Sequence, residues 1–177
     1  MEEIELKVLD INPKKLSEKL NKIRAIKKES KLIIEKYFDF NDGSISKKDN
    51  MFRIRKVGDK VEINYKDGRV KDKDFLIFKE ELETTINDFD IIERIIKKLG
   101  LKVIIHREKK RTSFIAGKIK IEVHEYPKIP AFAEFEGSKK YIKKLIERLG
   151  YNTNQTTSMT DTEIIKSYNV DYKKLTF

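Results

Sequence analysis

The feature that most constrains the fold is a strict alternation that collects charged residues on one face of each predicted strand. Residues 3–8 show it first, with Ile4, Leu6 and Val8 on one side and charged residues on the other. A period of two is typical of a β-strand. A single half-buried strand would turn its charged side to water, but later segments repeat the division. The charged faces therefore have to be explained together.

Turn and capping residues divide the rest of the chain into further strands and helices. Asn12-Pro13, Asn87 and Ser138 are predicted to start three amphipathic helices, and Gly100 and Gly150 to end the second and third. We predict strands over residues 31–40, 51–57, 61–66, 75–83, 101–111, 118–126 and 132–136. Residues 112–116 extend the strand over residues 101–111 or open a new strand, residues 67–74 form a charged loop, and a short helix covers residues 161–168.

The helices determine what the strands can form. Each helix carries an apolar stripe, and together they can cover the apolar face of an antiparallel sheet. The opposite face must then meet solvent or close on itself, and about eight strands suffice to close a barrel around a small ligand. We therefore predict an α+β fold: a closed eight-stranded antiparallel β-barrel, or tunnel, with a charged interior and helices packed on the outside.

The length suits one domain, residues 1–177, built from two similar halves. Glu3-Ile4-Glu5 and Glu134-Phe135-Glu136 are both Glu-apolar-Glu strands that lead into an amphipathic helix, and two helices end alike in Leu-Gly. The halves would span roughly residues 1–100 and 101–177 and meet around one site.

Acidic and basic pairs on separate strands predict the chemistry of the interior. The pairs are Glu3/Glu5, Glu81/Glu83 and Glu134/Glu136, and Arg53/Arg55 and Lys109/Arg111, supported by Lys7, Lys66 and Lys79. Enclosed charges are stable only when they compensate one another or a ligand does so. Mg²⁺ or Mn²⁺ suits carboxylate oxygens, and Arg and Lys suit phosphate oxygens. We therefore predict a metal-assisted site for a chain of phosphates.

Composition adds a charge and several exclusions. The net charge of +10 favours a polyanionic partner. The absence of Cys excludes disulfides, thiol catalysis and Cys-ligated zinc. No apolar run is long enough to span a membrane and the N-terminus is acidic, so we expect a soluble, cytoplasmic protein. The alternative of another class is a non-enzymatic protein that binds nucleic acid or another polyanion. It would bind without Mg²⁺ and lose affinity steeply with salt.

Taken in order, these motifs resemble those of the CYTH domains, also called triphosphate tunnel metalloenzymes. Glu3-Ile4-Glu5-Leu6-Lys7 is similar to their opening E-x-E-x-K signature. The later matches are Tyr37-Phe38-Asp39, Arg53/Arg55, Lys66, Lys79-Glu80-Glu81-Leu82-Glu83, Lys109-Lys110-Arg111 and Glu134-Phe135-Glu136. The arrangement most resembles the class IV adenylate cyclase subgroup and its archaeal relatives.

The resemblance implies an antiparallel tunnel that binds a triphosphate together with Mg²⁺ or Mn²⁺. It implies that metal is held by Glu3, Glu5, Glu134 and Glu136. It implies that phosphates are bound by Lys7, Arg53, Arg55, Lys66, Lys79, Lys109 and Arg111. Glu5, Arg53, Arg55 and Arg111 would act most directly in the reaction, and Glu81 and Glu83 would support the cations or a second ion.

The chain departs from the family where a metal-linked Asp is usual, because it has Val123-His124 there. Glu122 lies on the same predicted face as His124, and either residue could replace the Asp. Tyr37 and Asp39 share an inward face with Glu35, and packing is the simpler role for Tyr37.

Two reactions are compatible with one tunnel. In the cyclase reaction, which the resemblance favours, the ribose 3′-hydroxyl of ATP attacks the α-phosphorus and gives cyclic AMP and pyrophosphate. In the triphosphatase reaction, water attacks the terminal phosphorus of tripolyphosphate, thiamine triphosphate or a nucleoside triphosphate. A pocket for the base would separate the two, and the sequence does not reveal one. The substrate, the choice between Mg²⁺ and Mn²⁺ and the oligomeric state also stay open, a homodimer being the commonest default.

Overall fold

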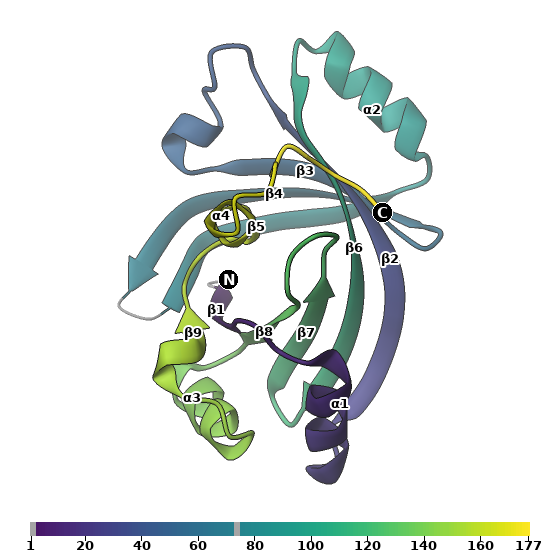
Figure 1. Ribbon diagram of the computed structural model, residues 1–177. Helices are drawn as coiled ribbons and strands as arrows, with labels where there is room; N and C mark the ends of the chain where they lie inside the picture. The colour runs from purple at the N-terminus through teal and green to yellow at the C-terminus, as the bar shows by residue number, and fades with distance from the viewer. Residues whose placement is uncertain (1–2, 73–74) are drawn as a thin grey trace.

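The computed structural model describes residues 3–72 and 75–177, apart from the side chains of residues 3, 69–72, 76–79 and 153. Within these residues, four α-helices surround one curved ten-stranded sheet (Figure 1). The longer strands are β1 (Glu3–Val8), β2 (Ile26–Asp39), β3 (Met51–Val57), β4 (Lys60–Asp72), β5 (Phe75–Ile86), β6 (Lys102–Ala116), β7 (Ile119–Glu125) and β8 (Phe132–Glu136). The remaining elements are α1 (Pro13–Lys22), α2 (Phe89–Lys98), α3 (Lys139–Arg148), α4 (Asp161–Ser167), the 3₁₀ turns η1 (Ser46–Lys48) and η2 (Thr153–Gln155), and the short strands β9 (Thr156–Thr157) and β10 (Lys174–Leu175).

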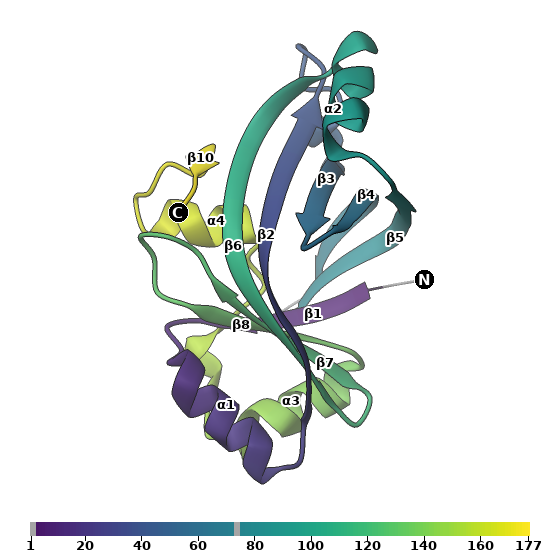
Figure 2. The ribbon, with the colours of Figure 1, turned by 90° about the vertical axis from the view of Figure 1, so that its right-hand side faces the viewer.

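The strand pairings of the sheet lead back to their starting point. From β6 they run through β2, β3, β4, β5, β1, β8 and β7, and β7 pairs again with β6. These pairings are antiparallel, whereas the two-residue β10 joins β6 in parallel and β9 pairs with β1. Figure 2 shows β2 and β6 as long curved ribbons that lie side by side. The predicted α+β class and antiparallel sheet are confirmed.

Helices α1 and α3 cover the apolar face of β1, β7 and β8, and they lie together at the lower end of both views (Figures 1 and 2). Their buried residues are Leu16, Leu20, Ile142 and Ile146. Burial of each such side chain contributes about 1.5–3 kcal/mol. Helix α1 begins as predicted, because Asn12 accepts a hydrogen bond from the Lys15 amide at 3.0 Å and Pro13 follows it.

Two smaller clusters complete the core. In one, Ile96 of α2 belongs to a cluster with Phe38 and Ile54. In the other, Ile164 and Ile165 of α4 belong to a cluster with buried residues of β8 and β10 and with Tyr126, which follows β7. None of the helices among the described residues has the length and apolar character that crossing a membrane requires. The helices thus cover part of the apolar side of the sheet, whereas Leu32 of β2 and Leu82 of β5 stay exposed.

Several boundaries differ from the sequence prediction, including the end of β5, which lies at Ile86 rather than at residue 83. Strand β2 begins at Ile26 rather than at residue 31, and β4 continues to Asp72 through residues predicted to be a charged loop. Pairing of residues 69–72 with β5 extends β4, and composition alone does not reveal such a partner. Helix α2 is capped by Asp88 rather than Asn87, since the Asp88 carboxylate accepts hydrogen bonds from the backbone amides of Asp90 and Ile91. Residues 112–116 extend β6.

Candidate active site

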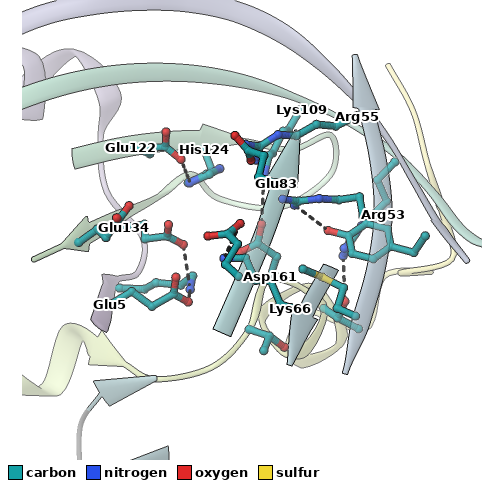
Figure 3. A pocket seen from close by; sticks show the side chains of 18 of the residues that line it. Glu5, Arg53, Arg55, Lys66, Glu83, Lys109, Glu122, His124, Glu134 and Asp161 are labelled. Carbon is teal, nitrogen blue, oxygen red and sulfur yellow. Dashed lines mark hydrogen bonds and ion pairs between the residues drawn. The ribbon is translucent and has the colours of Figure 1, made fainter. Parts of the chain in front are cut away.

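The curved sheet encloses a cavity of about 500 Å³ with charged walls. Its described lining residues are Glu5, Lys7, Tyr37, Met51, Arg53, Arg55, Lys66, Glu81, Glu83, Arg107, Lys109, Lys120, Glu122, His124, Glu134, Glu136, Thr160, Asp161 and Thr162. All strands from β1 to β8 contribute to this lining. Figure 3 shows carboxylates and His124 gathered on one side of the cavity, with Arg53 and Arg55 on the other.

The pairing of β1 with β8 brings the two Glu-apolar-Glu segments together. Glu5 lies opposite Glu136, and Lys7 lies opposite Glu134. The Lys7 ammonium contacts Glu5 and lies 2.9 Å from the Glu134 carboxylate. Burial, followed by the charge of Glu134, raises the pKa of Glu5 to about 7. Burial would also raise the pKa of Glu134, but Lys7 and His124 outweigh it and hold this pKa at about 2. A cation beyond Lys7 would therefore stabilise this carboxylate pair in its ionised form.

Glu122, His124 and Glu134 form a second group, on β7 and β8. One ligand atom of each residue lies within 4.8 Å of the others. The His124 side chain is buried and its ring stacks on Phe132, with centroids 5.1 Å apart. Burial, together with Lys109, lowers the pKa of His124 to about 4, so the ring is neutral near pH 7. Neutral imidazole and carboxylate are both ligands for divalent ions, so this donor set fits a divalent metal.

Glu35 organises the basic side of the cavity. Its carboxylate is completely buried on β2 and lies 3.0 Å from Arg53 and 3.4 Å from Lys109. Burial would raise the pKa of Glu35, but Lys109 and Arg53 outweigh it and hold this pKa at about 2. The alternation of β2 places Glu35 on the inward face, but strand order, which the sequence leaves undefined, decides which cations it meets.

Arg55, Lys66 and Lys120 of the cavity also contact carboxylates. Arg55 contacts Glu62 and lies 2.9 Å from Glu83, while Lys66 lies 3.5 Å from Glu81. The Lys120 ammonium lies 3.4 Å from Glu122 and 3.0 Å from Glu136. Without a ligand, the charges of the cavity largely neutralise one another.

The C-terminal segment contributes residues that the sequence prediction does not place in the site. Asp161, at the start of α4, lies 3.0 Å from the Lys109 ammonium and accepts a hydrogen bond of 2.8 Å from the Tyr126 hydroxyl. Arg107 donates to the Thr162 hydroxyl at 3.2 Å, and its guanidinium lies 4.8 Å from the Tyr37 ring centroid. The inward face of β6 predicts the position of Arg107. Asp161 lies outside the alternating segments, so no pattern in the sequence predicts that it reaches the cavity.

Most residues that the sequence assigns to the site line this cavity, and among the described side chains Asp39 and Arg111 do not. Asp39 is buried outside it, where its carboxylate accepts hydrogen bonds from the amides of Phe40, Ile45 and Ser46 and so holds the turn after β2. Arg111 is not part of the described lining, although its guanidinium lies 3.4 Å from Glu122. The side chains of Glu3 and Lys79 lie outside the described part of the structure.

Comparison of the sequence with families and with curated proteins gives one match. The model of the CYTH domain matches residues 1–147. No curated protein matches the sequence.

Solved structures of similar proteins share the fold. A conserved hypothetical protein from Pyrococcus furiosus has a TM-score of 0.77 at 22% identity, over 92% of this chain and 99% of its own. A presumed adenylate cyclase from Vibrio parahaemolyticus has a TM-score of 0.80 at 18% identity, over 93% of this chain and 97% of its own. A presumed adenylyl cyclase from Hippeastrum, for which a dominant triphosphatase activity is reported, has a TM-score of 0.65 at 14% identity. The match covers 93% of this chain and 95% of the Hippeastrum chain. At these identities the likeness establishes the fold alone.

Proposed function

Since this chain belongs to the CYTH domain family, we propose that it is a divalent-metal-dependent enzyme that acts on a triphosphate held in its charged cavity. The observation that carries the proposal is the convergence of carboxylates and cations from seven of the eight longer strands on one cavity. Phosphoryl transfer mainly requires positioning and neutralisation of charge, and such a lining can supply both.

The proposal includes closure of the sheet into an eight-stranded tunnel, as the sequence predicts. The strand pairings that return to β6 support it. So does the burial of Lys7, Glu35, Arg107 and Lys109, which would be exposed on a flat sheet with an uncovered charged face. In an enclosed space of low dielectric, each of these charges acts more strongly on a bound phosphate than it would in water.

Binding of substrate would exchange internal ion pairs for external ones. A triphosphate would take Lys7, Arg55 and Lys66 from their present carboxylate partners. Glu5 and Glu134 would then lack the counter-charge of Lys7, which is costly for buried groups. A divalent ion supplies that charge, so the exchange favours binding of the triphosphate and the metal together.

The residues fall into two roles in this proposal. Glu5, Glu134 and Glu136 would hold the metal, with Glu122 or His124 replacing the Asp that the family has. When bound, the metal would polarise a phosphoryl oxygen and neutralise charge. Lys7, Arg53, Arg55, Lys66 and Lys109 would orient the phosphates and stabilise the charge of the leaving group.

Hydrolysis of the terminal phosphate is the reaction that the lining favours. Apart from His124, only Tyr37 and Met51 among the described lining residues are aromatic or apolar. The Tyr37 ring faces the guanidiniums of Arg53 and Arg107, with 5.7 Å and 4.8 Å between the guanidinium carbons and the ring centroid. A purine pocket normally has more apolar wall than this. Cyclisation of ATP is the second candidate, because the fold is shared with presumed adenylate cyclases.

The test is incubation of the protein with Mg²⁺ or Mn²⁺ and either tripolyphosphate, thiamine triphosphate or ATP. Chromatography would separate orthophosphate, pyrophosphate and cyclic AMP. We expect orthophosphate from tripolyphosphate and no turnover in EDTA. Cyclic AMP as the main product from ATP would instead support the cyclase reaction. Absence of metal-dependent turnover of all three substrates would contradict both.

Variants locate the reaction in the cavity. We expect Glu5→Ala and Arg55→Ala each to lower kcat by roughly 10²–10³-fold or more, because Glu5 would hold the metal and Arg55 would stabilise charge on the phosphates. Glu147→Ala and Arg148→Ala remove the same charges from the exposed surface of α3 and should leave kcat unchanged. Circular dichroism would verify the fold of all four variants. Wild-type rates for Glu5→Ala or Arg55→Ala would contradict the assignment.

A further inference from the structure

The ring of His124 is a buried polar group that the protein itself does not satisfy. Its relative exposure is 2%, and neither ring nitrogen has a hydrogen-bond partner among the described residues. Buried polar groups of this kind normally have hydrogen-bond partners, and leaving one without a partner is destabilising. The ring is nevertheless fixed, because it stacks on Phe132 at an interplanar angle of 18°. A fixed, unpaired imidazole that lines a cavity is arranged as a ligand for something that enters the cavity.

The neighbours of the His124 ring are carboxylates, so the species that binds there should be a cation. The nearer carboxylate oxygen of Glu122 lies 3.8 Å from Nε2, and Glu134 completes the group whose ligand atoms lie within 4.8 Å of one another. The register of β7 and β8 places Glu122 directly opposite Glu134, so the backbone itself sets the spacing of the two carboxylates. Figure 3 shows Glu122, His124 and Glu134 close together on the same side of the cavity. One nitrogen and two carboxylates around a shared point suit a dication.

We propose that His124 is a nitrogen ligand of the divalent ion and gives this site a preference for first-row transition dications, such as Mn²⁺ and Co²⁺, over Mg²⁺. This inference rests on the proposed function, because it specifies the metal used in the same cavity. Mg²⁺ prefers oxygen ligands in near-octahedral geometry and gives up its bound water reluctantly. Imidazole binds transition dications well, and affinity generally rises from Mn²⁺ to Co²⁺. An Asp at this position would offer oxygen alone, so the departure from the family pattern changes the ligand chemistry.

The direct test is pulsed electron paramagnetic resonance of Mn²⁺ bound to the untagged, full-length protein without any triphosphate. The chain contains only two histidines, so nitrogen coupling from an imidazole has few possible sources. We expect ¹⁴N coupling in the wild type, its loss in His124→Asn, and its retention in His106→Asn. His106 is the matched control because it lies on β6 outside the cavity lining. Absence of nitrogen coupling in the wild type would overturn the inference, and this result depends on no variant being folded.

Competition between metals provides the second measurement. Mn²⁺ and Mg²⁺ affinities of the metal-stripped protein would be determined by calorimetric titration and competition. We expect His124→Asp to lower the ratio of Mn²⁺ to Mg²⁺ affinity by about 10–100-fold, the size typical of a changed metal environment. His106→Asn should leave the ratio unchanged. An equal ratio in wild type and His124→Asp would overturn the inference.

These readouts are separate from turnover. Metal binding without nitrogen coupling, in a protein that still hydrolyses a triphosphate, would end this inference and leave the proposed function intact. Nitrogen-ligated Mn²⁺ in a protein that turns over no triphosphate would support His124 as a ligand and contradict the enzymatic proposal.

Discussion

Glu35 is the residue on which the basic side of the cavity depends most. Its carboxylate is fully buried between Arg53 and Lys109. Replacement by Gln would leave two buried cations with less counter-charge, in surroundings that screen them poorly. We expect Glu35→Gln to lower the free energy of unfolding by about 3–5 kcal/mol, as measured by urea unfolding.

Glu29→Gln is the matched control for this prediction. Glu29 also contacts an arginine, Arg111, at 3.0 Å, but its side chain is 32% exposed. Because water reaches the Glu29 carboxylate, this partly exposed pair should contribute less to stability than the fully buried pairs of Glu35. If the two variants lost equal stability, burial would not be what makes Glu35 important.

The acid dependence of stability should also depend on Glu35. Its pKa is about 2 in the folded protein against 4.5 as the ordinary value. Because the folded pKa is the lower one, the contribution of Glu35 is complete above pH 4.5 and is lost as the pH falls towards 2. The loss amounts to at most about 3 kcal/mol. Thermal unfolding from pH 7 to pH 3 should therefore show the difference between wild type and Glu35→Gln shrinking on acidification. A constant difference would contradict the assignment.

Single residues differ in how far the sequence predicts them. Alternation places Glu35 and Arg107 on inward faces, and motifs single out Glu5 and Arg55. Alternation also places Asp39 on an inward face, but hydrogen bonds to the following turn hold its carboxylate outside the cavity. Asp161 enters the cavity from a polar tail, where neither a period nor a motif links it to the strands.

At the scale of elements, the C-terminal segment is part of the cavity wall rather than an appendage. Helix α4 presents Thr160, Asp161 and Thr162 to the cavity and buries Ile164 and Ile165 on its other side. We expect Ile164→Ala to lower the free energy of unfolding by about 2–5 kcal/mol, because it leaves a cavity in a fully buried cluster. Urea unfolding would measure the loss.

Ile91→Ala in α2 serves as the comparison, since Ile91 has the same chemistry but is 52% exposed. Its loss should be clearly smaller. Equal losses would indicate that α4 docks only loosely on Phe132 and Leu175.

Elements with strong local signals are predicted best. Helix caps and apolar stripes place α1 and α3, because these signals act within one or two turns. The second half of β4 is missed because its charged residues resemble a loop, and only hydrogen bonds to β5 make it a strand. Such pairing depends on a distant segment and leaves no trace in local composition.

At the scale of the whole molecule, binding of metal and triphosphate should be coupled. The cations of the cavity already contact carboxylates, so neither ligand can bind without disturbing pairs that the other restores. We expect a non-hydrolysable imidotriphosphate to bind at least about tenfold more tightly with Mn²⁺ than in EDTA, a difference of about 1.4 kcal/mol. By linkage, it should raise the affinity for Mn²⁺ by the same factor. Isothermal titration calorimetry in both orders would measure this, and metal-independent affinity would favour the simple polyanion binder.

The sequence predicts which faces of the sheet lie inside and outside, but it does not predict the order and register of the strands. Repeated charged faces predict that the strands turn them towards one another, and covering helices predict which side lies outside. The sequence does not predict that β1 lies between β5 and β8, because this order depends on contacts between residues far apart in the chain.

That position of β1 has a consequence for how the protein is made. Strand β1 pairs with residues 76–78 on one edge and with residues 133–136 on the other. It stays unpaired, with Leu6 and Val8 unprotected, until those later segments have been synthesised. Contacts so distant in sequence slow folding and prolong exposure to aggregation. A chaperone that shields β1 during translation would therefore raise the yield of native protein.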